Sequence, residues 1–465
     1  MSRRDVKRSK TSPWAAMAVC ALVITRSVAA APALEEVAAG VSIDVGQISV
    51  SGISSGGFMA HQFHVAHSDH VMGAGIVAGG PYYCAKGKFL NALTRCSQIA
   101  MLQCIALKRD PKRCEETDLV PKNNSESQRA ARASFDEAKK QEAAGNISKL
   151  ANLADDKIYL FSGAFDAIVP HGVMDAVFHF YVDPTKAGVD AVNIDYNGTF
   201  PARHTMVRDS FDKPAGDVVG TCPLPPAPSP PRAEDAFIDD CEGVAEQHRK
   251  DNGCVCPPSS ASGAATGAAC PPSNKQAVCK DLKDVGLAGA MLTRMYGEQA
   301  LATQRVPVEE SEVQAFDQRE VFSDFSTEPY KPYNAWQNAS MARDGYVFIP
   351  KACKEGRLCK LHVAFHGCLQ GGATDKRTGH SGNLLSKYAG YNERAATNDI
   401  IVLYPQVQAR SSDPINPHGC WDWWGQDYTD EAYHTKRGRQ IKAVAQMINI
   451  LVGGQKLLDV PPERR

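Results

Sequence analysis

Near its N-terminus the chain reads Ile48-Ser49-Val50-Ser51-Gly52-Ile53-Ser54-Ser55-Gly56-Gly57-Phe58-Met59-Ala60. A run rich in β-branched residues leads into Gly-x-Ser-x-Gly, and residues compatible with a helix follow. This order is typical of a nucleophile elbow, a sharp strand-to-helix turn that presents a serine hydroxyl. Ser54 is then the candidate nucleophile, and the amide of Ser55, at the helix start, is placed to stabilise an oxyanion. An ordinary glycine- and serine-rich turn is the alternative for the pentapeptide alone.

Two later strands are followed by the residues that would complete a catalytic triad. Residues 157–161 read as a buried strand followed by Asp166, and residues 191–196 read as a strand followed by a loop with His204. A serine hydroxyl is a poor nucleophile at neutral pH, so an imidazole must accept its proton and a carboxylate must orient that imidazole. A turn-forming aspartate and a surface histidine are the alternatives for the two residues taken singly. The order Ser54, Asp166, His204 is that of the α/β-hydrolases and favours the triad.

The elbow stands in an unusual place, because several strands normally precede it in an α/β-hydrolase. Residues 345–350, 361–365 and 400–405 also read as strands, and all three follow His204 in the chain. The middle strand ends in His366-Gly367, the kind of turn that supplies a second oxyanion amide in hydrolases. The pattern therefore predicts an α/β fold with a mostly parallel sheet flanked by helices, in which the strands expected before the elbow come after it.

Two cysteine-containing segments interrupt the predicted strands. Residues 84–154 are helical and polar with four cysteines, and residues 209–281 are rich in proline with six cysteines. A linker to a second domain is the alternative for the later segment, but the strands that follow it belong to the first fold. We expect one catalytic domain over residues 31–465, with both segments as disulfide-stapled excursions.

The N-terminal segment predicts export. Residues 1–30 carry a basic start, an apolar core over 14–24 that is too short to span a bilayer, and small residues suited to cleavage at 28–30. A retained membrane anchor is the alternative. Fourteen of the 15 cysteines lie after residue 30, and an even number in an exported chain indicates disulfides. We therefore expect a secreted protein, extracellular or periplasmic.

Charge and residue spacing exclude several classes of protein. Removal of residues 1–30 takes a net charge of +5 from the whole-chain value of −1 and leaves −6, which gives no electrostatic attraction for nucleic acid. No run after residue 30 is long and apolar enough to cross a membrane. Histidines recur every third residue at 61, 64, 67 and 70, but this spacing turns around a helix and does not converge on a metal. The pair Cys254 and Cys256 lacks the usual zinc spacing. We expect no metal and no cofactor.

With these motifs in place, the chain resembles the poly(3-hydroxybutyrate) depolymerases that have a circularly permuted α/β-hydrolase fold. The likeness covers most of the chain after residue 30. Its matching stretches are the elbow at 52–60, Ser162-Gly163-Ala164-Phe165-Asp166, the His204 loop, residues 289–292, 359–368, 390–392 and 403–406, and Cys420-Trp421-Asp422-Trp423-Trp424.

The resemblance implies a role for each candidate residue. Ser54 corresponds to the nucleophile, Asp166 to the orienting acid and His204 to the general base. The amides of Ser55 and Cys368 correspond to the oxyanion hole. The resemblance also implies a disulfide between Cys368 and Cys420, which would hold Trp421 beside the active-site mouth, where its apolar face could contact a methyl group of the substrate. Core packing is the alternative for the tryptophans at 421, 423 and 424.

The motifs predict a secreted serine esterase that acts through an acyl-enzyme, and the resemblance implies that it hydrolyses poly- or oligo(3-hydroxybutyrate)-type ester bonds. One alternative is a carboxylesterase or feruloyl esterase acting on plant-wall esters. Another is a non-catalytic, disulfide-rich binding protein with a degenerate hydrolase fold. The expected partner is a polyester or a hydroxyalkanoate oligomer. The sequence leaves open which of the two it is, the remaining disulfide pairs and the oligomeric state.

Overall fold

The computed structural model describes residues 31–183, 188–200, 202–208, 238–240, 286–297, 300–302, 305–325, 335–371, 383–412, 414–425, 428 and 431–459. The predicted signal peptide, residues 1–30, lies outside the described residues. So does the predicted excursion at 209–281, apart from the short strand β6 (Ile238–Asp240), which pairs with β5 (Met206–Arg208).

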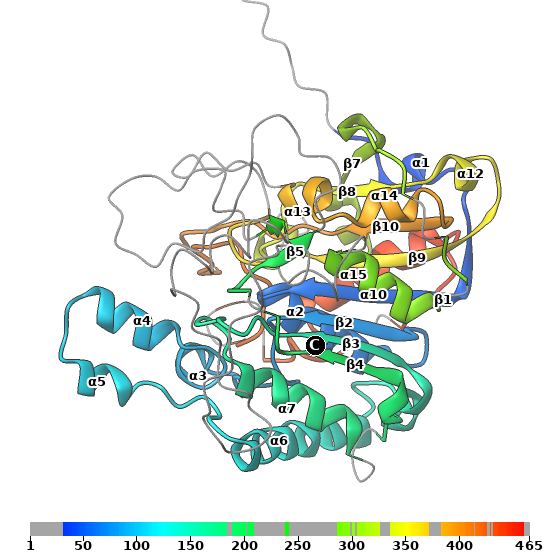
Figure 1. The fold of residues 1–465 in the computed structure, drawn as a ribbon. Helices are drawn as coiled ribbons and strands as arrows, with labels where there is room; N and C mark the ends of the chain where they lie inside the picture. Colours follow the sequence, from blue (N-terminus) through cyan, green and yellow to red (C-terminus); the bar gives the residue numbers. More distant parts are fainter. Residues whose placement is uncertain are drawn as a thin grey trace, which may run out of the picture. The chain divides into compact units, whose positions relative to one another are not determined.

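An eight-stranded sheet forms the centre of the fold, in the order β4-β3-β2-β1-β9-β10-β8-β7 (Figure 1). All pairs from β4 to β10 are parallel, whereas β8 pairs antiparallel with both β10 and β7. The mostly parallel sheet predicted from the sequence is confirmed. Its strands are β1 (Ser42–Ile53), β2 (Gly73–Val77), β3 (Lys157–Phe161), β4 (Ile194–Asn197), β7 (Val313–Asp317), β8 (Asp344–Phe348), β9 (Leu358–Phe365) and β10 (Ile400–Tyr404).

The strands expected before the elbow lie directly beside it. In Figure 1 the yellow strand β9 lies next to the blue strand β1, although more than 300 residues separate them in the chain. Their pairing runs from Ser42 opposite Leu358 to Gly52 opposite Phe365. This parallel pairing places the C-terminal ends of both strands at the same edge of the sheet, and the loops that follow them carry Ser54 and Cys368.

Helices cover both faces of the sheet, and its strands are therefore buried on both sides. Within β10, Ile401 and Leu403 belong to one hydrophobic cluster, while Ile400, Val402 and Tyr404 belong to another. Successive side chains of a strand point to opposite faces, so the two clusters are the two sides of the sheet. The first includes α2 (Ser55–Ala66), α6 (Asn124–Ala143), α7 (His171–Val182) and α15 (Arg439–Leu451), and the second α10 (Gly286–Tyr296), α13 (Leu384–Tyr388) and α14 (Tyr391–Ala395).

The remaining short elements connect these layers. They are α1 (Leu34–Val37), α11 (Ala335–Asn338) and α12 (Lys351–Lys354), with 3-10 turns at Leu150–Asp155, Ala191–Asn193, Glu310–Glu312 and Gln318–Phe325. No helix within the described ranges is both long enough and apolar enough to cross a bilayer. In the same ranges, no cluster of histidine, cysteine and acidic side chains is arranged to hold a metal ion.

Residues 84–115 form a projecting arm of three short helices, α3 (Phe89–Thr94), α4 (Ile99–Ala106) and α5 (Pro111–Glu115). Disulfides Cys84–Cys96 and Cys104–Cys114 tie the arm together, as the cysteine pattern predicts. In Figure 1 its cyan helices α4 and α5 extend away from the sheet. The rest of the segment predicted as an excursion differs, since α6 packs on α7 within the main core.

Candidate active site

The predicted elbow is present between β1 and α2. Ser54 has φ 57° and ψ −124°, a conformation that side-chain-bearing residues rarely adopt and that is typical of functional sites. A side chain at Gly52 would lie 2.2 Å from the carbonyl oxygen of Gly56, and one at Gly56 would lie 2.3 Å from that of Phe365. Both glycines are therefore required by the close approach of backbone to backbone.

The helix that follows presents its first amides at the elbow. The N–H of Ser54 donates to the carbonyl of Val77 on the neighbouring strand at 2.9 Å. Ser55 is the first residue of α2, and the first amides of a helix have no partner within the helix. The positive end of the helix dipole and the Ser55 amide thus lie immediately after the candidate nucleophile.

Asp166 and His204 contact each other through their side chains. Nδ1 of His204 lies 2.8 Å from Oδ2 of Asp166, and both side chains are buried. The second carboxylate oxygen, Oδ1, accepts hydrogen bonds of 2.9 Å from the amides of Ile168 and Val169. Because the Asp166 carboxylate accepts hydrogen bonds, Nδ1 of His204 is the donor to it. Nε2 is then the nitrogen of the ring that can accept a proton.

Backbone pairing joins the loop with Asp166 to the loop with His204. The amides of Ala164 and Phe165 donate to the carbonyls of Phe200 and Ala202, at 2.8 and 3.0 Å. A side chain at Gly163 would lie 2.3 Å from the Ala202 carbonyl oxygen. The two loops therefore form one unit, which fixes the acid relative to the histidine.

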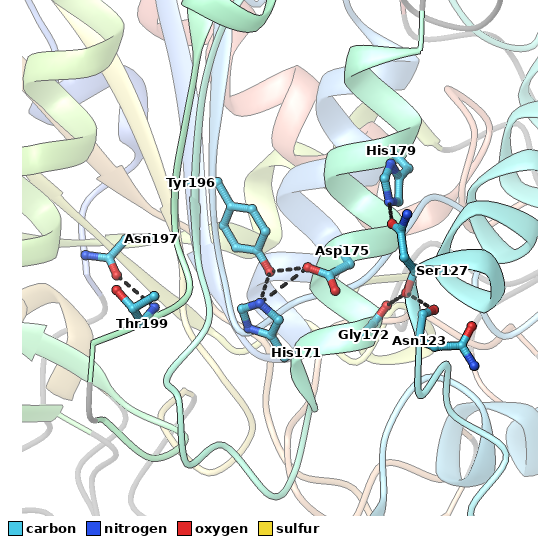
Figure 2. Close-up of polar contacts among 10 residues, drawn as sticks. Asn123, Ser127, His171, Gly172, Asp175, His179, Tyr196, Asn197 and Thr199 are labelled. Atoms are coloured by element: carbon cyan, nitrogen blue, oxygen red, sulfur yellow. Dashed lines mark hydrogen bonds and ion pairs between the residues drawn. The ribbon is translucent and has the colours of Figure 1, made fainter. Parts of the chain in front are cut away.

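Polar side chains of α7 and of the end of β4 contact one another, as Figure 2 shows. The side chain of Asn197, at the end of β4, accepts from the amide of Thr199 at 3.3 Å. Tyr196 donates to Asp175 at 2.9 Å, and the ring of His171 stacks on the tyrosine ring. Burial raises the pKa of Tyr196, so the phenol keeps its proton. These contacts join the first turns of α7, which follows the Asp166 loop in the chain, to β4, which precedes the His204 loop.

Ser54, His204 and Cys368 line one pocket of about 620 Å³. The amide-bearing turn at Gly367 and Cys368 borders it, and Asp166 lies behind His204. The predicted disulfide between Cys368 and Cys420 is confirmed, and it connects this turn to the loop that forms another wall. Of the residues proposed from the sequence, the structure thus brings the serine, the histidine and the second oxyanion candidate to one cavity.

No protein-family model matches the chain, but individual proteins of known sequence or structure do. The chain is 31% identical over 446 residues to a poly(3-hydroxybutyrate) depolymerase of Delftia acidovorans. The chain is a homologue of the poly(3-hydroxybutyrate) depolymerases. The match covers 95% of this chain but 65% of the Delftia protein, so the chain spans less than two thirds of that relative's length. A polyhydroxybutyrate depolymerase of Talaromyces funiculosus is 26% identical over 429 residues, which cover 89% of this chain and 91% of that protein.

Solved depolymerase structures share the fold. A PHB depolymerase from Penicillium funiculosum is 25% identical with a TM-score of 0.58, covering 92% of this chain and 99% of its own. A PHB depolymerase complexed with an R3HB trimer matches with the same TM-score at 24% identity. The resemblance drawn from the motifs and the predicted permuted α/β-hydrolase fold are confirmed.

The position of one tryptophan in this depolymerase homologue differs from the prediction. Trp421, expected beside the active-site mouth, is fully buried, with its ring edge-on to Phe365 at 5.0 Å, and it does not line the pocket. Trp423 and Trp424 line the pocket instead. Trp421 packs inward because Phe365 of β9 lies against its ring, and the following turn is held by the Asp422 side chain, which accepts from the amide of Trp424 at 3.2 Å.

The arm provides a further pocket wall that the sequence did not predict. Phe89, Leu93 and Ile99 line the cavity, and the Phe89 ring lies edge-on to Trp424 at 5.5 Å. The only sequence signal for this wall is an apolar run enclosed by Cys84 and Cys96. A cysteine pair around such a run indicates a stapled segment, but it does not indicate where that segment packs.

Proposed function

We propose that the chain is a secreted serine esterase that hydrolyses poly- or oligo(3-hydroxybutyrate)-type ester bonds. The observation that carries this proposal is the convergence of Ser54, the Asp166–His204 pair and Cys368 on one pocket. The family relationship supports it, as does the R3HB trimer with which one solved relative is complexed.

The proposed reaction proceeds through an acyl-enzyme. Ser54 Oγ attacks the ester carbonyl while Nε2 of His204 accepts the hydroxyl proton, and the amides of Ser55 and Cys368 stabilise the oxyanion. Collapse of this intermediate breaks the bond to the alcohol, which leaves with the proton from His204. A water molecule then gives its proton to His204 and attacks the acyl group, which releases the acid and restores Ser54.

The pocket walls favour an aliphatic substrate. Trp423, Trp424, Phe89 and Leu93 give large apolar surfaces, and the volume of about 620 Å³ falls within the range of small-molecule sites. An ester chain with methyl branches buries apolar area on such walls without leaving hydroxyl groups unpaired. A sugar ester would instead place several hydroxyl groups against apolar surface.

The proposed secretion rests on the cysteines. Four disulfides lie within the described residues, and disulfides persist mainly in oxidising compartments. The basic and apolar character of residues 1–30 agrees with an export signal. Recovery of the mature protein from the medium or periplasm, with its N-terminus near residue 31, is the expected result.

The decisive experiment compares the wild-type chain with Ser54→Ala. The wild type should clear a poly(3-hydroxybutyrate) suspension or cleave defined oligomers, and the variant should lose turnover by roughly 10⁴-fold or more with an unchanged melting temperature. A fluorophosphonate probe should label only the wild type. Release of hydroxycinnamate without cleavage of hydroxybutyrate esters would favour the plant-wall esterase, and a folded wild type that is neither labelled nor active would favour the binding protein.

A further inference from the structure

In the loop that follows β9, all but one of the backbone amides from Gly367 to Gln370 donate hydrogen bonds. The amide of Gly367 donates to Oε1 of Gln370 at 2.6 Å, and that of Leu369 donates to the carbonyl of His418 at 2.7 Å. The Gln370 amide donates to the Gly367 carbonyl at 3.3 Å. Among the described residues the amide of Cys368 alone in this run makes no hydrogen bond, and Cys368 lines the pocket.

The direction of the Cys368 amide is set by the carbonyl of Gly367, because the two belong to one peptide unit. Nδ1 of His366 donates to that carbonyl oxygen at 2.7 Å. The amide of Val407 donates to Nε2 of the same ring at 3.1 Å, so Nε2 is the acceptor and Nδ1 carries the proton. A trans peptide is planar, with its C=O and N–H on opposite sides. Fixing the Gly367 oxygen therefore fixes the Cys368 N–H.

Close packing supports the same arrangement. A side chain at Gly371 would lie 1.9 Å from Nε2 of His366, so only glycine leaves room for the imidazole. A side chain at Gly367 would lie 3.3 Å from Cβ of Ser54, which places this loop directly against the candidate nucleophile. Burial lowers the pKa of His366 to about 4, so the ring stays neutral and keeps one donor and one acceptor at neutral pH.

We propose that His366 and Gln370 are positioning residues, which hold the Gly367–Cys368 peptide so that the Cys368 amide donates to the oxyanion. Gln370 holds the amide on one side of Gly367, and His366 holds the carbonyl on the other. The inference rests on the proposed esterase function and adds to it the two side chains that prepare the oxyanion hole before substrate binds.

The test removes the acceptor on Gln370 with little change of volume, in the variant Gln370→Met. Loss of a whole oxyanion donor costs about 10²–10³-fold in kcat, so a misdirected donor should lower kcat by at least about tenfold, with KM within about threefold. The matched control is Gln318→Met. Gln318 is equally buried and also bonds to backbone groups, those of Ala342 and Gln406, but it does not line the pocket. This control should lose stability but keep kcat.

A thionoester substrate separates positioning from general stability, because its sulfur accepts hydrogen bonds poorly. The wild type should hydrolyse the oxygen ester much faster than the thionoester, and Gln370→Met should reduce that ratio by about tenfold. The ratio should not change in Gln318→Met. An unchanged ratio with kcat within twofold of the wild type would overturn the inference while leaving the esterase function intact. An inactive wild type would instead refute the proposed function.

A second pair of variants keeps the inference testable where Gln370→Met does not fold. His366→Asn retains an N–H close to the position of Nδ1, whereas His366→Leu removes it. The asparagine variant should keep at least about tenfold more kcat than the leucine variant at equal melting temperatures. Equal kcat values in the two variants would contradict a positioning role for His366.

Discussion

The glycines around Ser54 let the backbone of the elbow lie directly against the end of β9, because they carry no side chain. A methyl group at Gly56 would lie 2.3 Å from the carbonyl of Phe365, the last residue of β9. We predict that Gly56→Ala destabilises the fold by about 2–3 kcal/mol, as overpacking does, and also lowers kcat, because the loop after β9 must move. Gly46→Ala is the control. A side chain there meets only the carboxylate of Asp44 at 3.4 Å, so urea melts and kcat should match the wild type.

One wall of the pocket is formed by the arm, whose first helix is enclosed by a disulfide. Cys84–Cys96 closes a loop with a sequence separation of 12 residues around Phe89 and Leu93. Replacing both cysteines by alanine should cost about 3 kcal/mol and lower kcat/KM on oligomers, because the pocket wall loses its fixed shape. The control replaces Cys353 and Cys359, whose separation is 6, and should cost about 2 kcal/mol without affecting kcat/KM. An equal loss of kcat/KM in both double variants would show that the arm does not shape the site.

The sequence predicts those features that are set by residues close together in the chain, and not those set by contacts between distant segments. Ser54, Asp166 and His204 each follow a strand, and strand periodicity with glycine punctuation is readable from neighbouring residues alone. The inward position of Trp421 is not, because its ring packs on Phe365 of β9 and its loop is linked to residue 368 by a disulfide. The packing of Phe89 on Trp424 is equally non-local. The motif His366-Gly367 predicts an oxyanion turn, whereas the hydrogen bond from the Gly367 amide to Gln370 is visible only in the structure.

The free energy of unfolding at acid pH depends on several elements of the molecule at once, because each of them buries a neutral histidine. Burial lowers the pKa values of His61, His67 and His362 to about 3, and that of His366 to about 4. These folded-state values lie below the unfolded value of 6.5, so the unfolded chain binds more protons. The stability that depends on their being neutral is complete above about pH 6.5 and is lost as the pH falls toward 3.

We therefore predict a steep fall in the free energy of unfolding between pH 6.5 and pH 4, by about 1.4 kcal/mol per pH unit for each histidine. Urea melts at several pH values measure this slope. His61→Phe keeps an aromatic ring next to Phe180 and should make the slope shallower. A slope unchanged by this variant would contradict a neutral, buried His61.

The pairing of β1 with β9 also bears on how the protein is made. Residues 54, 166 and 204 leave the ribosome early, but the strand that covers β1 and the turn that carries Cys368 follow more than 150 residues later. Until then β1 is an open sheet edge, and its contacts have large sequence separation, which slows folding. A nascent chain of 300 residues thus contains every proposed proton-transfer group and no oxyanion turn. We therefore expect a chain that ends at residue 300 to show no esterase activity.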